Sequence, residues 1–499
     1  METWTEGYVA EIDYAQAYYA EMAPAHLSFA LLLNGIRPPI EPGAGFAYAE
    51  LGCGQGLTSN LLASLHPDSR FEAMDFLPSH IAGARRLAAD SGSLNAHFSD
   101  DSFAEFARRD GAEFDVIALH GVWSWISAEN RRALVQILRR RLKPGGAVYV
   151  SYNCLPGWAA HMPIRQLLRQ HVEASSAPMD ERIGNALRFV RALAEADDRG
   201  YFAQVPSAVA HLNGLELKSD SYIAHEYLNR DWVPFYHADV ARDLAAAKLS
   251  YGASATLPDN DDSWSLDATA QARLKATDDP TLRETLRDSL SYRRFRRDIF
   301  VKGLRRLPAA ERAALLRAAR VGLCVAAGEV PHTVKSPCGE VAVPPALIEA
   351  LAEGPQTLDH LAQGGDFAET LHTVVMLVGE GLAASLPGGD AAERLPGAQR
   401  FNAAVLRRNR YSPDIRQLAS PVLGGGVMVG LIERLFLLAR LEDADPVAFA
   451  WMVLAERGKR LRRGGEELVS AEENLAEMDR LHRAFESGPL PLLRGLGIA

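Results

Sequence analysis

The sequence predicts an α/β fold: a doubly wound, mostly parallel sheet with a helical insertion and a mostly helical C-terminal region. Three observations support this class. Strand-like and helix-like segments alternate through the first 150 residues, a glycine-rich turn joins the first strand to the first helix, and helical patterns dominate after Trp158. The chain has 499 residues, of which 48% are hydrophobic, so it can bury several cores.

The first half supplies the strands and helices of the sheet in alternating order. The fourth strand is an apolar run of the kind that parallel sheets bury on both faces. Right-handed crossovers would place the helices on the two faces of the sheet. We predict strands at 47–51, 70–76, 96–100, 114–121 and 147–153, and helices at 58–65, 79–92 and 128–142.

The second half is more irregular. A helix and strand at 237–257 and a strand from Phe295 should complete the sheet, with a polar, loop-rich segment at 258–280 between them. Residues 341–389 resemble a small winged-helix unit, and 386–399 reads as a loop. The predicted divisions are an N-terminal lid or helix (1–30), the α/β core (31–158), a helical insertion (159–232), the end of the core sheet (233–307), a winged-helix-like domain (308–395) and a C-terminal helical domain (396–499).

Composition excludes several functions. The net charge of −10 argues against broad nucleic-acid binding, which needs a basic face. The four cysteines are scattered and form no metal-ligand pattern, so we predict no metal site. The acidic start has no apolar signal segment, and Glu433 and Arg434 interrupt the most apolar late stretch, 424–441. We therefore expect a cytoplasmic protein in which that stretch is a buried helix.

The turn after the first strand has the pattern E-x-G-x-G-x-G, from Glu50 to Gly56. Glycines there allow positive φ angles and a close approach of the backbone to a ligand. Leu57 or Ser59 stands where the dinucleotide fingerprint needs its third glycine, and no phosphate-binding P-loop is present. The ligand should therefore need close backbone contact but no lysine to neutralise phosphates.

Acidic residues at the next two strand ends indicate a nucleoside. Asp75 lies 19 residues after Gly56 at the end of the second strand, where a carboxylate accepts hydrogen bonds from ribose hydroxyls. Asp100 and Asp101 end the third strand, within reach of an adenine edge. A nucleoside without a phosphate signal favours S-adenosylmethionine as the cofactor.

These motifs, in this order, resemble those of class I methyltransferases. "ELGCGQG", "MDFLPSHI", "FSDDSF" and "FDVIALHGVWSWI" match that family's first four motifs, and "LKPGGAVYVSYN" matches the fifth strand with its lead-in. The resemblance implies that the glycines line the methionine part of the cofactor and that Glu50 anchors the loop or reaches the amino group. It implies ribose binding by Asp75, a place beside the adenine for Phe76, and contact with the adenine amine by Asp100 or Asp101. The implied cofactor-binding residues are Glu50, Gly52, Cys53, Gly54, Gly56, Asp75, Phe76, Asp100, Asp101, Ser102, His120, Gly121 and Val122, the last three beside the sulfonium.

Two longer stretches carry a narrower resemblance. "HGVWSWI" with "NRRALVQILRRRLKPGGAVYVSYNCLPGW", and "HEYLNRDWVPFYHADVARDLAAAKLSYGASATL", are similar to methyltransferases that carry a methyltransferase regulatory domain after the core. That family includes bacterial enzymes that methylate lysines of outer-membrane proteins. The resemblance covers residues 10–305 well. It implies a protein substrate, such as an outer-membrane or other surface protein, methylated at lysine.

The acceptor site should lie at the C-terminal ends of the fourth and fifth strands. Tyr152 or Asn153 would orient an amine, while His120 fits a packing residue beside the cofactor better than a proton acceptor. Trp125 reads as core, and Tyr14, Tyr18 and Tyr19 as a helix face or a lid. The candidate catalytic residues are His120, Trp123, Tyr152, Asn153 and Trp158.

Several alternatives stay open at this point. A small-molecule N- or O-methyltransferase and a cofactor-binding regulator without turnover fit the same motifs. His225 and Glu226, with His237 and Asp239, match no strong metal pattern and read as structural. Residues 292–298 read as a solvated lead-in to a strand, and the C-terminal region as a protein-contact or homodimer surface.

Overall fold

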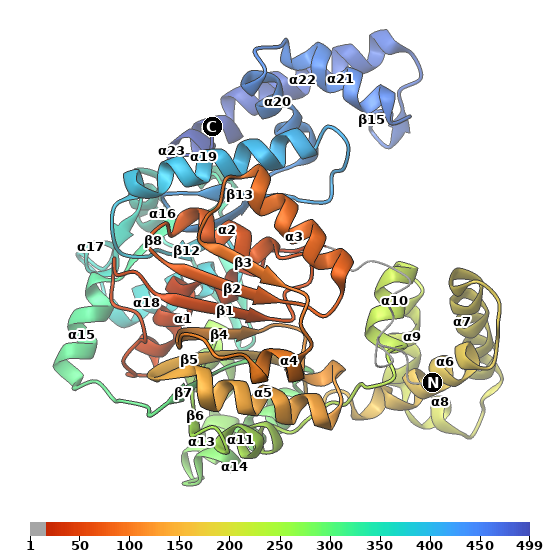
Figure 1. Ribbon diagram of the computed structural model, residues 1–499, viewed down its shortest axis with the longest axis vertical. Helices are drawn as coiled ribbons and strands as arrows, with labels where there is room; N and C mark the ends of the chain where they lie inside the picture. The colour runs from red at the N-terminus through yellow and green to blue at the C-terminus, as the bar shows by residue number, and fades with distance from the viewer. Residues whose placement is uncertain (1–15) are drawn as a thin grey trace.

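The structure, a computed structural model, describes residues 16–499 and is built on a seven-stranded sheet (Figure 1). Its order is β3-β2-β1-β4-β5-β7-β6, and β7 runs in the opposite direction to the other six strands. The predicted mostly parallel, doubly wound fold is confirmed. The strands are β1 Ala47–Leu51, β2 Arg70–Met74, β3 Ala96–Ser99, β4 Phe114–Leu119, β5 Leu142–Asn153, β6 Leu249–Ser254 and β7 Phe295–Lys302.

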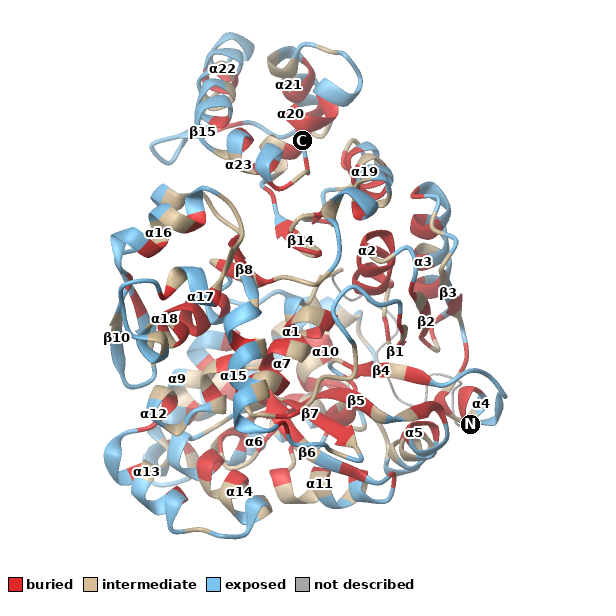
Figure 2. Ribbon diagram, turned by 90° about the vertical axis from the view of Figure 1, so that its left-hand side faces the viewer, coloured by how far each residue is buried: buried red, intermediate tan, exposed pale blue. Residues whose placement is uncertain are grey.

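Helices cover both faces of the sheet, because alternate side chains of each strand point to opposite faces. Tyr48 of β1 packs in the core shared with α1 and α2, whereas its neighbour Ala49 packs in the core shared with α4, α5 and α11. Figure 2 shows β4, β5 and α2 as largely buried elements. The helices of this layer are α1 Pro24–Leu33, preceded by the 3-10 turn η1 Ala20–Met22, α2 Leu57–Leu65, α3 Pro78–Asp90, α4 Phe103–Arg108, α5 Ala128–Arg141 and α11 His237–Ala245.

A group of helices between β5 and α11 has a hydrophobic core of its own. Trp158 and Trp232, near its two ends, pack edge-to-face with ring centroids 4.8 Å apart. These helices stand to the right of the sheet in Figure 1. They are η3 Ala159–His161, α6 Met162–Glu173, α7 Met179–Ala196, α8 Tyr201–Gln204, α9 Pro206–Leu215 and α10 Asp220–Tyr227.

The C-terminal region is mostly helical, as predicted. Strands β8 Arg320–Leu323, β11 Gln356–Thr357 and β12 Ala383–Ser385 form a small antiparallel sheet beside α15 Ala309–Ala318, α16 Pro345–Ala352, α17 Leu358–Leu361 and α18 Phe367–Gly379. The winged-helix assignment of this unit stays a prediction. The other elements after β7 are η5 Ala327–Glu329, β9 Thr333–Ser336, β10 Gly339–Ala342, α19 Ala391–Arg408, β13 Gln417–Ser420, β14 Gly425–Met428, α20 Leu431–Leu441, α21 Pro446–Glu456, β15 Arg462–Arg463, β16 Glu466–Glu467, α22 Ala471–Ser487 and α23 Pro489–Gly495.

Two segments predicted as loops are largely helical. Residues 258–280 hold η4 Leu257–Asn260, α12 Asp262–Ser265, α13 Ala268–Lys275 and the start of α14 Pro280–Ser291. Residues 386–399 contain the first half of α19, despite Pro396 inside it. In both segments aspartates that look like loop residues cap the helices, because their carboxylates accept the free N–H groups of the first turn.

The apolar stretch 424–441 also differs in part from its prediction. Its second half is the buried helix α20, but its start forms the strand β14. Among the helices of residues 16–499, none combines the length and the apolar character needed to cross a membrane.

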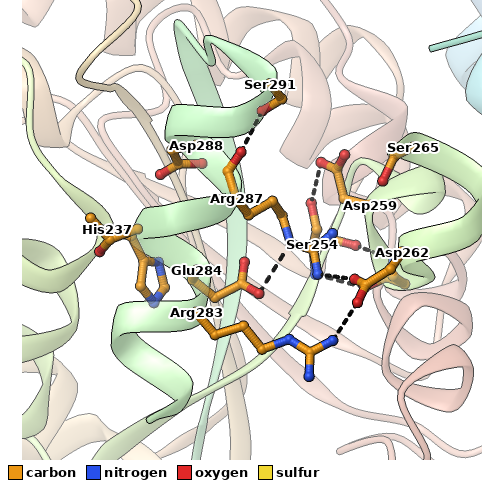
Figure 3. Close-up of polar contacts among 12 residues, drawn as sticks. His237, Ser254, Asp259, Asp262, Ser265, Arg283, Glu284, Arg287, Asp288 and Ser291 are labelled. Atoms are coloured by element: carbon orange, nitrogen blue, oxygen red, sulfur yellow. Dashed lines mark hydrogen bonds and ion pairs between the residues drawn. The ribbon is translucent and has the colours of Figure 1, made fainter. Parts of the chain in front are cut away.

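The basic segment 292–298 is only in part the solvated lead-in that the sequence predicts, because Tyr292 and Arg294 are exposed before β7 but residues inside the strand are buried. Arg296 is 3% exposed, and its guanidinium donates to Asp298 (2.9 Å), Asp288 (2.7 Å) and Glu284 (2.8 Å). Figure 3 shows the adjoining contacts, in which Arg287 bonds to Glu284 and Asp262. These ion pairs join β7 to α14. Each charge is buried, and a buried charge is tolerated only when it is paired, so separating the two elements would leave unpaired charges.

Candidate functional site

A cavity of about 790 Å³ opens at the C-terminal ends of the central strands. It lies where the strand order reverses between β1 and β4, which is the usual binding crevice of such sheets. Its volume suits a drug-sized ligand, since such pockets span about 300–1,000 Å³. The predicted residues that line it are Glu50, Gly52, Cys53, Gly54, Gly56, Asp75, Phe76, Asp100, Ser102, His120, Gly121, Val122, Asn153 and Trp158.

The glycine loop curves around one end of this cavity. Gly52, Gly54 and Gly56 have φ angles of 80°, 52° and 69°, which residues with a side chain rarely adopt. A Cβ on Gly52 would meet Val122 at 2.5 Å, and one on Gly56 would meet Ala84 and Phe98 at 2.7 Å. A Cβ on Gly54 would meet nothing within 4 Å. Gly52 and Gly56 therefore pack the loop against the domain, whereas Gly54 leaves its cavity side open.

Two carboxylates set the polarity of the loop. Asp75 accepts hydrogen bonds from the backbone N–H of Gly54 (2.8 Å) and of Leu77 (3.0 Å), so it ties the loop to the end of β2. Glu50 accepts the hydroxyl of Ser59 (2.5 Å). Burial, with a smaller contribution from the neighbouring Asp75, raises the pKa of Glu50 to about 7 against the lowering effect of its hydrogen bonds with Ser59. Glu50 is therefore close to half-ionised at neutral pH.

The end of β3 separates the two aspartates that the sequence leaves undivided. Asp100 lines the cavity, and its carboxylate lies 3.4 Å from Arg85. Asp101 is not among the cavity-lining residues and pairs with Arg109 at 2.7 Å. Ser102 lines the cavity while its hydroxyl caps α4. The geometry favours Asp100 over Asp101 for a ligand contact.

His120, at the end of β4, is held between aromatic rings. It stacks on Tyr19 with centroids 3.6 Å apart, and its Nδ1 lies 2.8 Å from the Tyr149 hydroxyl. Burial lowers the pKa of His120 to about 4, so the ring is neutral at neutral pH. Beside it, the Gly121 N–H donates to the Ser151 hydroxyl (2.8 Å). This setting suits the packing role that the sequence favours for His120.

The N-terminal tyrosines take different places. Tyr19 lines the cavity, as a lid residue would, whereas Tyr18 packs between the hydrophobic cores. Tyr14 lies outside the described residues.

Three aromatic predictions are wrong about which side chains face the cavity. Trp123 is fully buried among the core residues on the α5 face of the sheet, and Tyr152 is buried there too, with its hydroxyl donating to Asp298 (2.6 Å). Neither lines the cavity, but Trp125 does. Trp123 and Trp125 share one 3-10 turn, η2 Trp123–Trp125, and residues two apart in such a turn point in different directions.

The half of the cavity away from the glycine loop is walled by the inserted helices. Sequence reasoning misses these residues, although "HEYLN" stands out as a polar, aromatic motif. Asn153 lies at the boundary, 4% exposed, and its side-chain Nδ2 has no hydrogen-bond partner within residues 16–499. The lining residues of this half that were not predicted are Trp125, His211, Tyr222, His225, Glu226, Tyr227, Asn229, Asp231, Arg294 and Phe295.

His225 and Glu226 thus contribute to the cavity wall rather than only to helix structure. His237 instead lies 3.1 Å from Asp298 in the buried network, and Asp239 pairs with Arg242 on the surface. In the part of the chain that the structure describes, no three His, Cys, Asp or Glu side chains are grouped to hold a metal ion.

The cavity fits an adenosyl sulfonium on two local observations. The open side of Gly54 admits a ligand against the backbone, and the buried, unpartnered Asn153 amide offers a donor at the boundary between the two halves of the cavity. The lining also supplies Phe76 and acidic side chains at the ends of β2 and β3.

Comparisons with known proteins agree with this geometry. Residues 49–146 match the family described as "Methyltransferase domain", and residues 219–302 match "Predicted methyltransferase regulatory domain". Protein sll1526 of Synechocystis sp. is 39% identical over 508 residues, which cover all of both chains. Protein RP789 of Rickettsia prowazekii is 30% identical over 291 residues, 57% of this chain and 51% of that protein.

Solved structures share the fold over nearly the whole chain. PKMT2 from Rickettsia typhi in complex with AdoHcy has a TM-score of 0.70 at 17% identity, covering 94% of this chain and 97% of that one. A second structure of PKMT2 from Rickettsia typhi gives a TM-score of 0.68 at 16% identity. The chain therefore belongs, with sll1526, to the class I S-adenosylmethionine-dependent methyltransferases that carry a methyltransferase regulatory domain.

Proposed function

We propose that the enzyme methylates lysine side chains of a protein. One observation carries this proposal: six carboxylate side chains but only one guanidinium, and no lysine, line the cavity among the described residues. The aromatic rings of Trp125, Trp158, Tyr222 and Tyr227 form walls of its acceptor half. An acidic, aromatic cavity favours a cationic acceptor.

Aromatic walls also suit the chemistry of an amine. The cofactor supplies a methyl group on a sulfonium sulfur, and the protein must align an acceptor with it and exclude water. A lysine amine attacks only when neutral, and removal from water lowers its pKa. Ring faces still accept the cationic methylated product.

The remaining side chains have positioning roles in this proposal. The glycine loop and Asp75 hold the cofactor, and Asp100 borders its adenine. The unpartnered Nδ2 of Asn153 donates a hydrogen bond to an acceptor atom of the cofactor or of the bound substrate beside it. Tyr19 and His120 close the cavity next to the sulfonium.

The name of the Rickettsia typhi structure agrees with this proposal, since PKMT denotes a protein lysine methyltransferase. At 17% identity that likeness speaks for the fold alone. The choice of lysine as acceptor therefore rests on the charge and the aromatic walls of the cavity.

The test uses the purified enzyme, S-adenosylmethionine labelled in its methyl group and a proteome extract. Label recovered as methyl-lysine after acid hydrolysis of the protein fraction is the expected result. Label only in small molecules would show the alternative N- or O-methyltransferase. Binding of AdoHcy by calorimetry with no transfer to any fraction would show a cofactor-binding regulator.

A further inference from the structure

The six acidic side chains around the cavity differ in whether they already have a partner. Five are bound by the protein itself: Glu50 by Ser59, Asp75 by two backbone N–H groups, Asp100 by Arg85, Glu105 by Ser102 and Asp231 by Arg230. The Glu226 side chain has neither a hydrogen bond nor an ion pair with any residue in the range 16–499. It is the cavity carboxylate left for a ligand.

Glu226 lies in the acceptor half of the cavity. It belongs to α10 beside Tyr222 and Tyr227, which line the same cavity. Burial, with a smaller contribution from the charge of Glu226, raises the pKa of both tyrosines. Glu226 itself is half-buried, and burial raises its pKa to about 7. A carboxyl with this pKa can both bind a cation and take up a proton near neutral pH.

Three other charged or titratable groups near Glu226 have partners of their own. Arg294 places its guanidinium 5.5 Å from the Trp158 ring centroid and 3.1 Å from His211 Nδ1. His211 Nε2 lies 2.9 Å from the Tyr227 hydroxyl, and burial lowers the pKa of His211 to about 4. Asp231 is paired with Arg230. With His211 neutral, Arg294 stacked and Asp231 paired, Glu226 is the carboxylate of this half without a side-chain partner in residues 16–499.

We propose that Glu226 receives the ammonium group of the acceptor lysine and takes one proton from it before methyl transfer. This inference rests on the proposed lysine acceptor. The ammonium gives its proton to the carboxylate, so a neutral amine and a carboxylic acid replace an ion pair that burial disfavours.

The amine nitrogen then forms a bond to the methyl carbon as the carbon–sulfur bond breaks. The sulfur keeps that electron pair and becomes a neutral thioether, and the nitrogen takes the positive charge. Glu226 returns its proton to water when the product leaves. Charge and atoms balance without any further reactant.

The test compares E226Q, which keeps the shape but cannot accept a proton, with E226D and with E195Q. Glu195 is an exposed residue of α7 in the same insertion and is not among the cavity-lining residues, so E195Q controls for the loss of one acidic charge. Methyl-lysine formed in the proteome extract is measured from pH 6 to pH 10 after hydrolysis, and AdoHcy binding is measured by calorimetry.

At pH 7 we expect E226Q to be slower by about 10²–10⁴-fold, the range for general-base catalysis. Its rate should rise about tenfold per pH unit toward the ordinary lysine pKa of about 10.4, whereas the wild-type rate should level off above pH 7. E226D should be slowed but level off like the wild type, and E195Q should match the wild type. AdoHcy affinity should be unchanged in all three variants.

A wild-type rate and pH profile in E226Q would overturn the proposal. Loss of AdoHcy binding in E226Q would overturn it too, because Glu226 would then be a structural residue. Absence of methyl-lysine with the wild-type enzyme would instead refute the lysine acceptor itself, so the two failures are distinguishable.

Discussion

Gly54 and Gly56 share a loop and a left-handed backbone, yet the structure predicts different consequences for replacing each with alanine. Their φ angles are 52° and 69°. The added methyl group would enter open space at Gly54 but would collide at 2.7 Å with Ala84 and Phe98 at Gly56. The first change should therefore impair binding more than stability, and the second should impair stability first.

The magnitudes follow from these contacts. A left-handed conformation costs a residue with a side chain about 1–2 kcal/mol, which both variants incur. Overpacking a tight site adds about 1–3 kcal/mol, which only G56A incurs. The free energy of unfolding should thus fall by about 1–2 kcal/mol in G54A and by about 2–5 kcal/mol in G56A.

Denaturant unfolding followed by tryptophan fluorescence measures the free energy of unfolding, and calorimetric titration with AdoHcy measures the binding affinity. We expect G54A to bind AdoHcy at least about tenfold more weakly, a cost of about 1.4 kcal/mol, since its methyl group enters the cavity. Equal stability losses in the two variants, or wild-type AdoHcy binding by G54A, would refute this reasoning.

Three further predictions concern charged and hydrogen-bonding groups. The pKa of Glu50 is about 7, and its carboxylate form should attract the cofactor's amino group. AdoHcy affinity should therefore rise from pH 6 to pH 8 in the wild type and stay constant in E50Q. Calorimetric titrations that show the same pH dependence of affinity for both proteins would contradict this. D100N should weaken AdoHcy binding more than D101N, because only Asp100 lines the cavity, and the reverse order would restore Asp101 as the ligand contact. Y152F should lower the free energy of unfolding by about 1–3 kcal/mol, since the buried Asp298 loses a donor, but should leave AdoHcy affinity unchanged; a loss of affinity without a loss of stability would place Tyr152 in the binding site after all.

The sheet and the cofactor loop could be predicted because their signals are local. The first and fourth strands are short, mainly apolar segments, and the order strand, glycine turn, helix is contained in residues 47–65. Asp75 follows from its place at the next strand end. The helices α12, α13 and α19 were missed because aspartate, glycine and proline mark both loops and helix starts.

The acceptor half of the cavity could not be predicted in the same way. Glu226 and His211 reach it through the packing of the inserted helices, which depends on contacts such as Trp158 with Trp232, 74 positions apart. The exchange of Trp123 and Trp125 shows a related limit. The sequence places both tryptophans just after the fourth strand but assigns Trp123 to the site and Trp125 to the core. The structure reverses this, because the direction of each side chain depends on the 3-10 turn that carries it.

The antiparallel strand β7 limits how far the protein can be shortened. Its register sets Phe295 opposite Asn153, and both residues line the cavity. Phe295 lies within the regulatory-domain match (219–302), whereas Asn153 follows shortly after the methyltransferase-domain match (49–146). A polypeptide shortened to residues 49–146 would end inside β5 and leave an open sheet edge. It would also lack the cavity-lining residues that α10 and β7 contribute. Residues 219–302 thus supply part of the cavity wall, so exchanging this segment between relatives should change the shape of the cavity directly.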